Sequence, residues 1–282
     1  MIHIATVHWE SDKWIDIQLK YLNRYVRKPF RIYAFLSGSA ANHRDKFYFA
    51  STEPIQSHAV KLNVLADIVC HEAVSDEDTL IFIDGDAFPI ANTDIKFEEW
   101  LSTSPLAAIQ RIENAGDIQP HPSFCITTVG FWRKIEGDWK MGFQWEYIPG
   151  LYRTDVGGNL LKLLNEGSVS WRKLLRTGGF IDHPILCSVY EGVIYHHAAG
   201  FRRPLSMYDR MSIPIVISNW KILTWLFVRL NGTFSLKNKF RLQRILRIDK
   251  KLIANNTTKS ELFFEKMISD DNAFENMFKA DT

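Results

Sequence analysis

The 282-residue chain has little of what marks several common classes of protein. Its three cysteines, Cys70, Cys125 and Cys187, lie far apart, without the spacing of a structural zinc site or a disulfide framework, so we expect buried thiols in a reducing compartment. No run of about 18 uninterrupted apolar residues is present, and MIHIATVHW is a strand pattern without a basic leader. These absences predict a cytoplasmic protein without a membrane span.

A strong charge imbalance is also missing. The 34 lysines and arginines nearly balance the 32 aspartates and glutamates, so the composition does not imply a nucleic-acid partner. Internal repeats and low-complexity linkers are absent as well, and the 46% hydrophobic content is enough for one large core. We expect one domain over residues 1–212, followed by a helical appendage over 213–282.

Strand-like and helix-like segments alternate along the chain. Ser11 and Ser57 stand where two helices are expected to begin, because serine caps helix N-termini. This alternation predicts an α/β fold with a mainly parallel sheet, covered by helices on both faces. The expected strands cover residues 2–7, 30–36, 46–50, 79–83, 106–112, 124–129 and 193–197.

The most informative stretch is TLIFIDGDAFPI, residues 79–90. Its apolar first half is typical of a strand buried on both faces, and it ends abruptly in Asp84-Gly85-Asp86. Two carboxylates at the carboxyl end of a buried strand can hold Mg²⁺ or Mn²⁺ against phosphate oxygens, at the edge where open α/β sheets bind ligands. A polar turn is the alternative interpretation, because Asp-Gly is also ordinary turn chemistry.

A second motif lies near residue 200. The segment VIYHHAAGFRRP contains His197, Gly200, Arg203 and Pro204 at the spacing of a His-x-x-Gly-x-x-Lys-Pro signature. Together with the Asp-x-Asp triplet, it resembles the glycosyltransferase family that includes glycogenin and bacterial lipopolysaccharide galactosyltransferases. This resemblance implies a GT-A fold, which is a Rossmann-like nucleotide-sugar-binding α/β domain. It also implies that the two aspartates and His197 hold a divalent cation, and that Arg203 meets the diphosphate.

Elementary chemistry agrees with these implied roles. A metal and a cation neutralise the charge that develops on a leaving diphosphate, and an imidazole beside two carboxylates favours Mn²⁺ over Mg²⁺. Arg203 adds a fork suited to phosphate, and Gly200 lets the backbone pass close to it. Side chains alternate across a strand, so only one of His196 and His197 can face the metal. The spacing to Gly200 favours His197, although a histidine on a strand is often a satisfied core residue.

Three further residues are candidates for donor contacts. Lys61, followed by Leu62, is similar to an Arg-Leu pair that the family uses near the donor sugar, but it can equally be a solvated helix residue. Asp155 lies in RTDVGGN, where the family touches the transferred sugar, and it either caps a helix or acts on the sugar or acceptor. His8, with Trp9, ends the first strand, where GT-A enzymes hold the nucleotide base; a Trp buried under a helix is the alternative.

The C-terminal segment has a distinct charge pattern. Residues 237–251 carry seven basic side chains and one acid, next to an apolar stretch over 219–230 that is too short to span a bilayer. This pattern predicts either peripheral contact with an anionic membrane surface or a helical hairpin packed on the core.

These signals combine into one functional hypothesis. We expect a metal-dependent glycosyltransferase that moves a hexose from a nucleotide-diphosphate sugar, taken as a UDP-sugar, to a glycan or glycolipid hydroxyl. A nucleotide-sugar-binding module with a decayed site is the alternative. An Asp-x-Asp phosphohydrolase fits less well, because Phe88 stands where those enzymes have Thr or Val.

Overall fold

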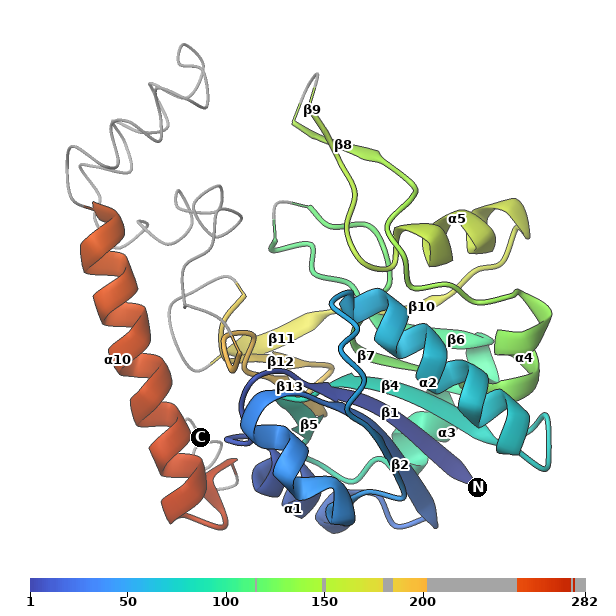
Figure 1. The fold of residues 1–282 in the computed structure, drawn as a ribbon. Coiled ribbons are helices and arrows are strands. Elements are labelled where there is room, and N and C mark those ends of the chain that lie inside the picture. The colour runs from blue at the N-terminus through green and yellow to red at the C-terminus, as the bar shows by residue number, and fades with distance from the viewer. Residues whose placement is uncertain (115, 149–150, 180–184, 202–247, 275, 277–282) are drawn as a thin grey trace.

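The strand that precedes the Asp-Gly-Asp triplet lies in the middle of the seven-stranded sheet that the described residues form (Figure 1). The computed structural model describes all residues except 115, 149–150, 180–184, 202–247, 275 and 277–282, and only the backbone of 147, 148, 151 and 248–253. The sheet order is β10-β6-β7-β4-β1-β2-β3. These strands are β1 (Ile2–His8), β2 (Phe30–Leu36), β3 (Phe49–Ser51), β4 (Thr79–Asp84), β6 (Leu106–Ile109), β7 (His121–Thr128) and β10 (Arg172–Leu174).

The sheet is mainly parallel, as the alternation of segments predicts. Among its seven described strands, only β7 runs antiparallel to its neighbours, β4 and β6. The other pairs, β1 with β2 and β4, β2 with β3, and β6 with β10, are parallel. The carboxyl ends of β1 and β4 therefore meet at one edge of the sheet.

Helices cover both faces of the sheet. Along β4, Leu80 and Phe82 belong to one core cluster and Ile81 and Ile83 to the other, because successive side chains point to opposite faces. The prediction of a strand buried on both faces is confirmed. Helices α1 (Ile15–Tyr25) and α3 (Asp94–Thr103) cover one face, and α2 (His58–Glu72), α4 (Val129–Lys134) and α5 (Gly158–Glu166) cover the other.

The two expected serine caps have different outcomes. Ser57 caps α2, since its Oγ accepts a hydrogen bond of 3.3 Å from the Val60 amide. Ser11 does not cap α1, which begins only at Ile15, after Trp14. Trp14 is fully buried, so the packing of its indole determines where this helix begins, and Ser11 accepts a hydrogen bond from Lys13 in the preceding turn.

A second, antiparallel sheet brings the two sequence motifs together. Its order is β11-β12-β13-β5, and β5 directly follows the Asp-Gly-Asp turn. The pairing of β13 with β5 places His196 opposite Ala87, one residue after Asp86. Pro89 lies on β5, an edge strand, where its missing N–H is tolerated. The bounds are β5 (Ala87–Pro89), β11 (Arg176–Gly179), β12 (Ser188–Tyr190) and β13 (Ile194–His196); a separate hairpin comprises β8 (Trp145–Ile148) and β9 (Leu151–Arg153), and a 3-10 helix covers Gly38–Lys46.

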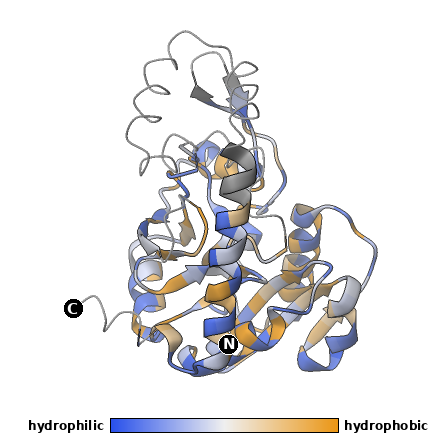
Figure 2. Cartoon of the chain, turned by 90° about the vertical axis from the view of Figure 1, so that its left-hand side faces the viewer, coloured by the Kyte–Doolittle hydropathy of each residue, from blue (hydrophilic) through white to orange (hydrophobic). Residues whose placement is uncertain are grey.

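The chain ends in a long helix, α10 (Ile248–Ser269), which lies beside the second sheet. Figure 2 views the molecule from the side on which this helix lies. Phe263, Phe264 and Met267 of α10 are buried in one cluster with Trp14 and Tyr195, so this part of the C-terminal segment packs on the core. None of the helices in the described part of the chain could serve as a transmembrane span. The side chains of the basic segment, 237–251, and Arg203 lie outside the described residues.

Candidate active site

The carboxyl ends of β1 and β4 border a pocket of about 490 Å³. Open α/β sheets place their ligands at this edge, so its position agrees with the prediction from the Asp-Gly-Asp turn. The charged and titratable side chains that line it come from six separate segments of the chain. They are His58, Asp84, Asp86, Arg111, His121, Asp155 and His196.

Asp84, Asp86 and His196 form a group that could hold a metal ion. Each offers one ligand atom, and these atoms all lie within 4.8 Å of one another. His196 Nε2 lies 3.6 Å from Asp84 Oδ2 and 3.5 Å from Asp86 Oδ1. The Asp86 and His196 side chains are buried, and that of Asp84 is 18% exposed toward the pocket. Carboxylate oxygens with one imidazole nitrogen are a ligand set that suits a divalent transition metal.

The Asp86 carboxylate is held in its ionised form. Burial by itself would raise its pKa, but the hydrogen bond with His196, the charges of His196 and His197, and the Gly200 N–H lower the pKa to about 2. The Gly200 N–H donates to Asp86 Oδ2 at 2.9 Å. A side chain at Gly200 would lie 2.6 Å from Asp86 Cβ and 2.4 Å from Trp14 Nε1, so only glycine fits. Gly200 thus contacts the metal group, whereas its expected contact with phosphate remains a proposal.

His196, and not His197, faces the carboxylates, so the prediction for His197 is wrong. The alternation of side chains allows only one of the two, and the pairing of β13 with β5 selects His196. The His197 ring points the other way: Nδ1 lies 2.8 Å from the Tyr195 hydroxyl, and Nε2 lies 2.6 Å from Ser260 Oγ. Burial lowers the pKa of His197 to about 4, so its imidazole is neutral near pH 7.

Two histidines that the sequence reasoning did not assign also line the pocket. His58, the first residue of α2, has its Nε2 3.2 Å from Asp84 Oδ1. His121 begins β7, and its ring centroid lies 6.4 Å from that of His196. Burial lowers the pKa of His121 well below its usual value. The only sequence signal for His58 is its place after the Ser57 cap, on the helix that precedes β4.

Arg111 and Asp155 form another part of the pocket lining. Arg111 Nη2 lies 3.3 Å from Asp155 Oδ2, and the Asp155 side chain is 31% exposed. Asp155 is not the N-cap of α5, because that position is taken by Gly157, whose φ of 91° suits glycine. The structure therefore excludes the helix-cap interpretation of Asp155. The Asp155 carboxylate borders the pocket instead.

A buried carboxylate, Asp117, holds Arg111 from behind. Its Oδ2 lies 3.1 Å from Arg111 Nη2 and accepts a hydrogen bond of 2.9 Å from Asn114 Nδ2. Asp117 is 1% exposed and also pairs with Arg153 at the end of β9. Two arginines thus compensate one buried aspartate, which fixes the loop after β6 against the β8–β9 hairpin.

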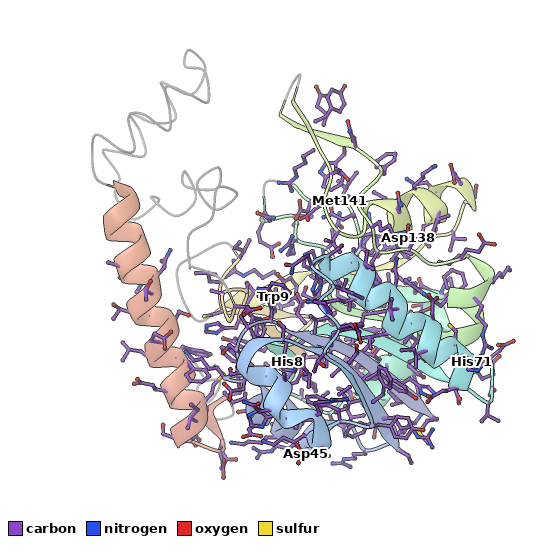
Figure 3. All side chains as sticks on the ribbon, viewed as in Figure 1. His8, Trp9, Asp45, His71, Asp138 and Met141 are labelled. Atoms are coloured by element: carbon purple, nitrogen blue, oxygen red, sulfur yellow. The ribbon has the colours of Figure 1, made fainter. Side chains whose placement is uncertain are left out.

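Some of the residues expected to contact the donor border the pocket, and others lie behind its lining. Trp9 lines the pocket, whereas His8 and Lys61 are not among the residues that border it. His8, at the end of β1 (Figure 3), is fully buried with its Nε2 3.1 Å from Gln18 Oε1, and burial lowers its pKa to about 4. Lys61 Nζ lies 3.8 Å from the Trp9 ring centroid, and burial lowers its pKa to about 8.

Comparisons with known proteins give only distant similarities. No family model matches this chain, and no curated protein matches it either. A structure of Staphylococcus aureus TarS residues 1–349 with UDP is 12% identical, with 86% of this chain and 75% of that chain covered and a TM-score of 0.44. A mannosyltransferase from Pyrobaculum calidifontis, PcManGT, with GDP-Man and Mn²⁺ is 11% identical, with 93% and 85% covered and a TM-score of 0.41.

The galactosyltransferase LgtC, with donor and acceptor sugar analogs, is 10% identical, with 77% of this chain and 95% of that chain covered and a TM-score of 0.38. Against a longer TarS structure, this chain covers 30% of the length. Two of these structures, PcManGT and LgtC, are of glycosyltransferases.

Proposed function

We propose that this chain is a metal-dependent GT-A glycosyltransferase that transfers a hexose from a nucleotide-diphosphate sugar to a glycan hydroxyl. The observation that carries the proposal is the group of Asp84, Asp86 and His196 at the carboxyl edge of a mainly parallel sheet. It borders a pocket of about 490 Å³, and cofactor pockets are typically about 300–1,000 Å³.

The chemistry of this group fits a divalent cation. Two carboxylates face one imidazole where solvent is largely excluded, and like charges brought together in this way are unfavourable unless a cation lies between them. The imidazole nitrogen favours Mn²⁺ over Mg²⁺, which prefers oxygen ligands. When bound, the cation would neutralise the negative charge of the donor diphosphate.

The chain's own residues have separate roles in this proposal. Asp86 stays ionised through its contacts with His196 and the Gly200 N–H, and His58 orients the outer oxygen of Asp84. Such partners of ligand carboxylates fix their orientation and thereby tune the affinity of a metal site. The site is in this way prepared before a cation binds.

The remaining lining residues are proposed to hold the donor and the acceptor. Trp9 presents an aromatic face for the nucleotide base, with Lys61 behind it, and Arg111 contributes positive charge. Asp155, whose Oδ2 lies 3.3 Å from Arg111 Nη2, would bind a sugar hydroxyl or deprotonate the acceptor. The contact with the diphosphate is assigned to Arg203 from the sequence resemblance alone.

The identity of the ligands is the finer part of the proposal. We take the donor to be a UDP-hexose and the acceptor a glycan or glycolipid, on the strength of the sequence resemblance. The basic residues of segment 237–251 favour contact with an anionic leaflet, where each contributes about 1 kcal/mol of attraction. Sedimentation with anionic liposomes tests this contact; binding that falls as salt rises supports it, and no binding at low salt contradicts it.

Thermal-shift screening tests the proposal as a whole. The full-length protein is heated with UDP-glucose, UDP-galactose, UDP-GlcNAc or GDP-mannose, with and without MnCl₂, and donor hydrolysis is then measured. A ligand at 100 times its Kd adds about 2.7 kcal/mol of stability. A shift that requires Mn²⁺, together with hydrolysis, supports a transferase. A shift without hydrolysis or transfer supports the binding-module alternative, and no shift with any donor contradicts the proposal.

A further inference from the structure

A buried serine on the C-terminal helix contacts the histidine that follows the metal group. Ser260 is 3% exposed, and its Oγ lies 2.6 Å from His197 Nε2, across 63 residues of sequence. The other ring nitrogen of His197 lies 2.8 Å from the Tyr195 hydroxyl. A neutral imidazole has one donor and one acceptor nitrogen, so these two hydroxyls satisfy both.

The backbone of His197 is hydrogen-bonded to Asp86, a member of the metal group. Its N–H donates to the Asp86 carbonyl at 3.0 Å, and its carbonyl accepts from the Cys187 N–H at 3.2 Å. His196 is the preceding residue, so its side chain leaves the strand on the opposite face. Whatever fixes His197 toward α10 therefore fixes His196 toward the carboxylates.

Packing connects α10 to the same place by a second route. The Phe264 ring lies 4.9 Å from Trp14, and Trp14 lies 4.4 Å from the His197 ring. Trp14 also reaches the space that the missing side chain of Gly200 leaves beside Asp86. At the edge of this contact, Lys13 Nζ lies 2.7 Å from Glu261 Oε2 of α10.

We infer that Ser260 is a positioning residue of the metal group, and that docking of α10 and binding of the cation favour each other. The inference rests on the proposed function, because it takes Asp84, Asp86 and His196 to be metal ligands. Without the Ser260 hydroxyl, a buried imidazole nitrogen of His197 loses its partner, which is unfavourable enough to turn the ring. Coupling between two binding equilibria is reciprocal, so the cation must in turn stabilise the docked helix.

Calorimetry on the full-length protein tests the positioning role. MnCl₂ is titrated, with and without UDP, into the unchanged protein and into Ser260→Ala, Ser260→Thr and Ser269→Ala. Loss of a residue that orients a metal ligand weakens binding by about 10–100-fold, so this more remote contact should raise the Mn²⁺ Kd by about 5–10-fold in Ser260→Ala. Ser260→Thr, which keeps a hydroxyl, should restore most of the affinity.

Ser269→Ala is the matched control, since Ser269 is exposed on the same helix and its Oγ reaches only the Lys266 carbonyl, at 3.4 Å. Its Mn²⁺ Kd should equal that of the unchanged protein. If Ser260→Ala lowers the melting temperature but leaves the Mn²⁺ Kd unchanged, Ser260 is merely structural and the inference is overturned.

Hydrogen exchange on the unchanged protein gives a test that does not depend on a variant folding. Mn²⁺ should slow amide exchange over residues 256–267 of α10, while α3 on the first sheet serves as the reference. Equal exchange in this range with and without bound Mn²⁺ overturns the coupling and leaves the proposed function intact. If the unchanged protein binds no Mn²⁺ with any nucleotide, the proposed function and this inference fail together.

Discussion

The two ends of β1 and β4 differ in how completely their polar side chains are paired. At the amino end, the Met1 amino group lies 2.9 Å from Asp78 Oδ1. His3 lies 3.4 Å from Asp78 Oδ2 and 3.1 Å from the Tyr33 hydroxyl, which donates to Glu72 at 3.0 Å. Each of these groups contacts another member of the set, so this end is a completed network.

At the carboxyl end the pairing is incomplete. Asp84 Oδ1 faces His58 Nε2 at 3.2 Å and Asp86 Oδ2 accepts from the Gly200 N–H at 2.9 Å, while the other oxygens of the two carboxylates share His196 Nε2, at 3.6 and 3.5 Å. The Nδ1 atoms of His8 and His196 are buried without a hydrogen-bond partner in the described part of the chain. Buried polar groups are normally satisfied, and groups that are not often mark sites that a ligand completes. Changes at the amino end should therefore affect stability, and changes at the carboxyl end should affect ligand binding.

The largest effect is expected at Asp86. Asp86→Asn should lower Mn²⁺-dependent donor hydrolysis by more than about 100-fold. Mutation of a residue that only hydrogen-bonds to a metal ligand already lowers metal affinity or activity by about 10–100-fold. Asp86 is only 4% exposed, so some loss of stability should accompany the change. Asp78→Asn is the matched variant at the amino end; it should lower the free energy of unfolding by about 1 kcal/mol and leave turnover unchanged. If Asp86→Asn keeps wild-type turnover with the same metal requirement, the metal site does not lie at the carboxyl end of β1 and β4.

The adjacent histidines should separate binding from stability. His196→Ala should weaken Mn²⁺ binding by about 10–100-fold, as loss of a ligand side chain requires. His197→Ala removes a group that fills the space between β13 and α10, so it should lower the free energy of unfolding by about 1–3 kcal/mol and weaken Mn²⁺ less than His196→Ala does. Calorimetry and urea unfolding measure the two quantities. The reverse ranking of Mn²⁺ affinities would show that the strand presents His197 instead.

The two partners of Arg111 should separate in the same way. Asp155→Asn should lower kcat roughly tenfold, equivalent to one charged hydrogen bond of about 1.5 kcal/mol, with little change in stability. Asp117→Asn removes the buried carboxylate that Arg111 and Arg153 share and should lower the free energy of unfolding by about 3–5 kcal/mol. Steady-state kinetics and urea unfolding distinguish these outcomes. A large loss of stability in Asp155→Asn would assign that residue to the scaffold.

The smallest effect is a pH dependence of stability that involves His8. Burial lowers its folded-state pKa to about 4, below the unfolded value of 6.5, so the unfolded chain binds more protons between these values. The free energy of unfolding should therefore fall as pH falls from about 6.5 to about 4. Urea unfolding at pH 7 and pH 5 measures the difference, which His8→Asn should reduce. An unchanged slope in this variant would show that His8 does not contribute.

The sequence predicts the central sheet well because its signals are local. The apolar run of β4, the Ser57 cap and the alternation of strands with helices each depend on neighbouring residues, and the structure confirms all three. Helix α1 is the exception, because the burial of Trp14 overrides the Ser11 cap. A local signal fails where a distant contact competes with it.

The site was only partly predictable for the same reason. Asp84 and Asp86 are adjacent to a strong strand pattern, so the expectation that they lie at a ligand-binding edge needs no distant contact. The choice between His196 and His197 depends on the register of β13 against β5 and on Ser260 of α10, 63 residues later. Arg111 had no sequence signal, because it enters the pocket through a loop that Asp117 holds.

The central claim is that Asp84, Asp86 and His196 hold a divalent cation, and pulsed electron paramagnetic resonance of bound Mn²⁺ tests it directly. The nucleus of a coordinating imidazole nitrogen modulates the Mn²⁺ spin echo, so the full-length protein should show nitrogen modulation. His196→Gln should abolish the modulation, whereas His197→Gln should retain it. Bound Mn²⁺ without nitrogen modulation, or modulation that disappears in His197→Gln and persists in His196→Gln, would contradict the claim.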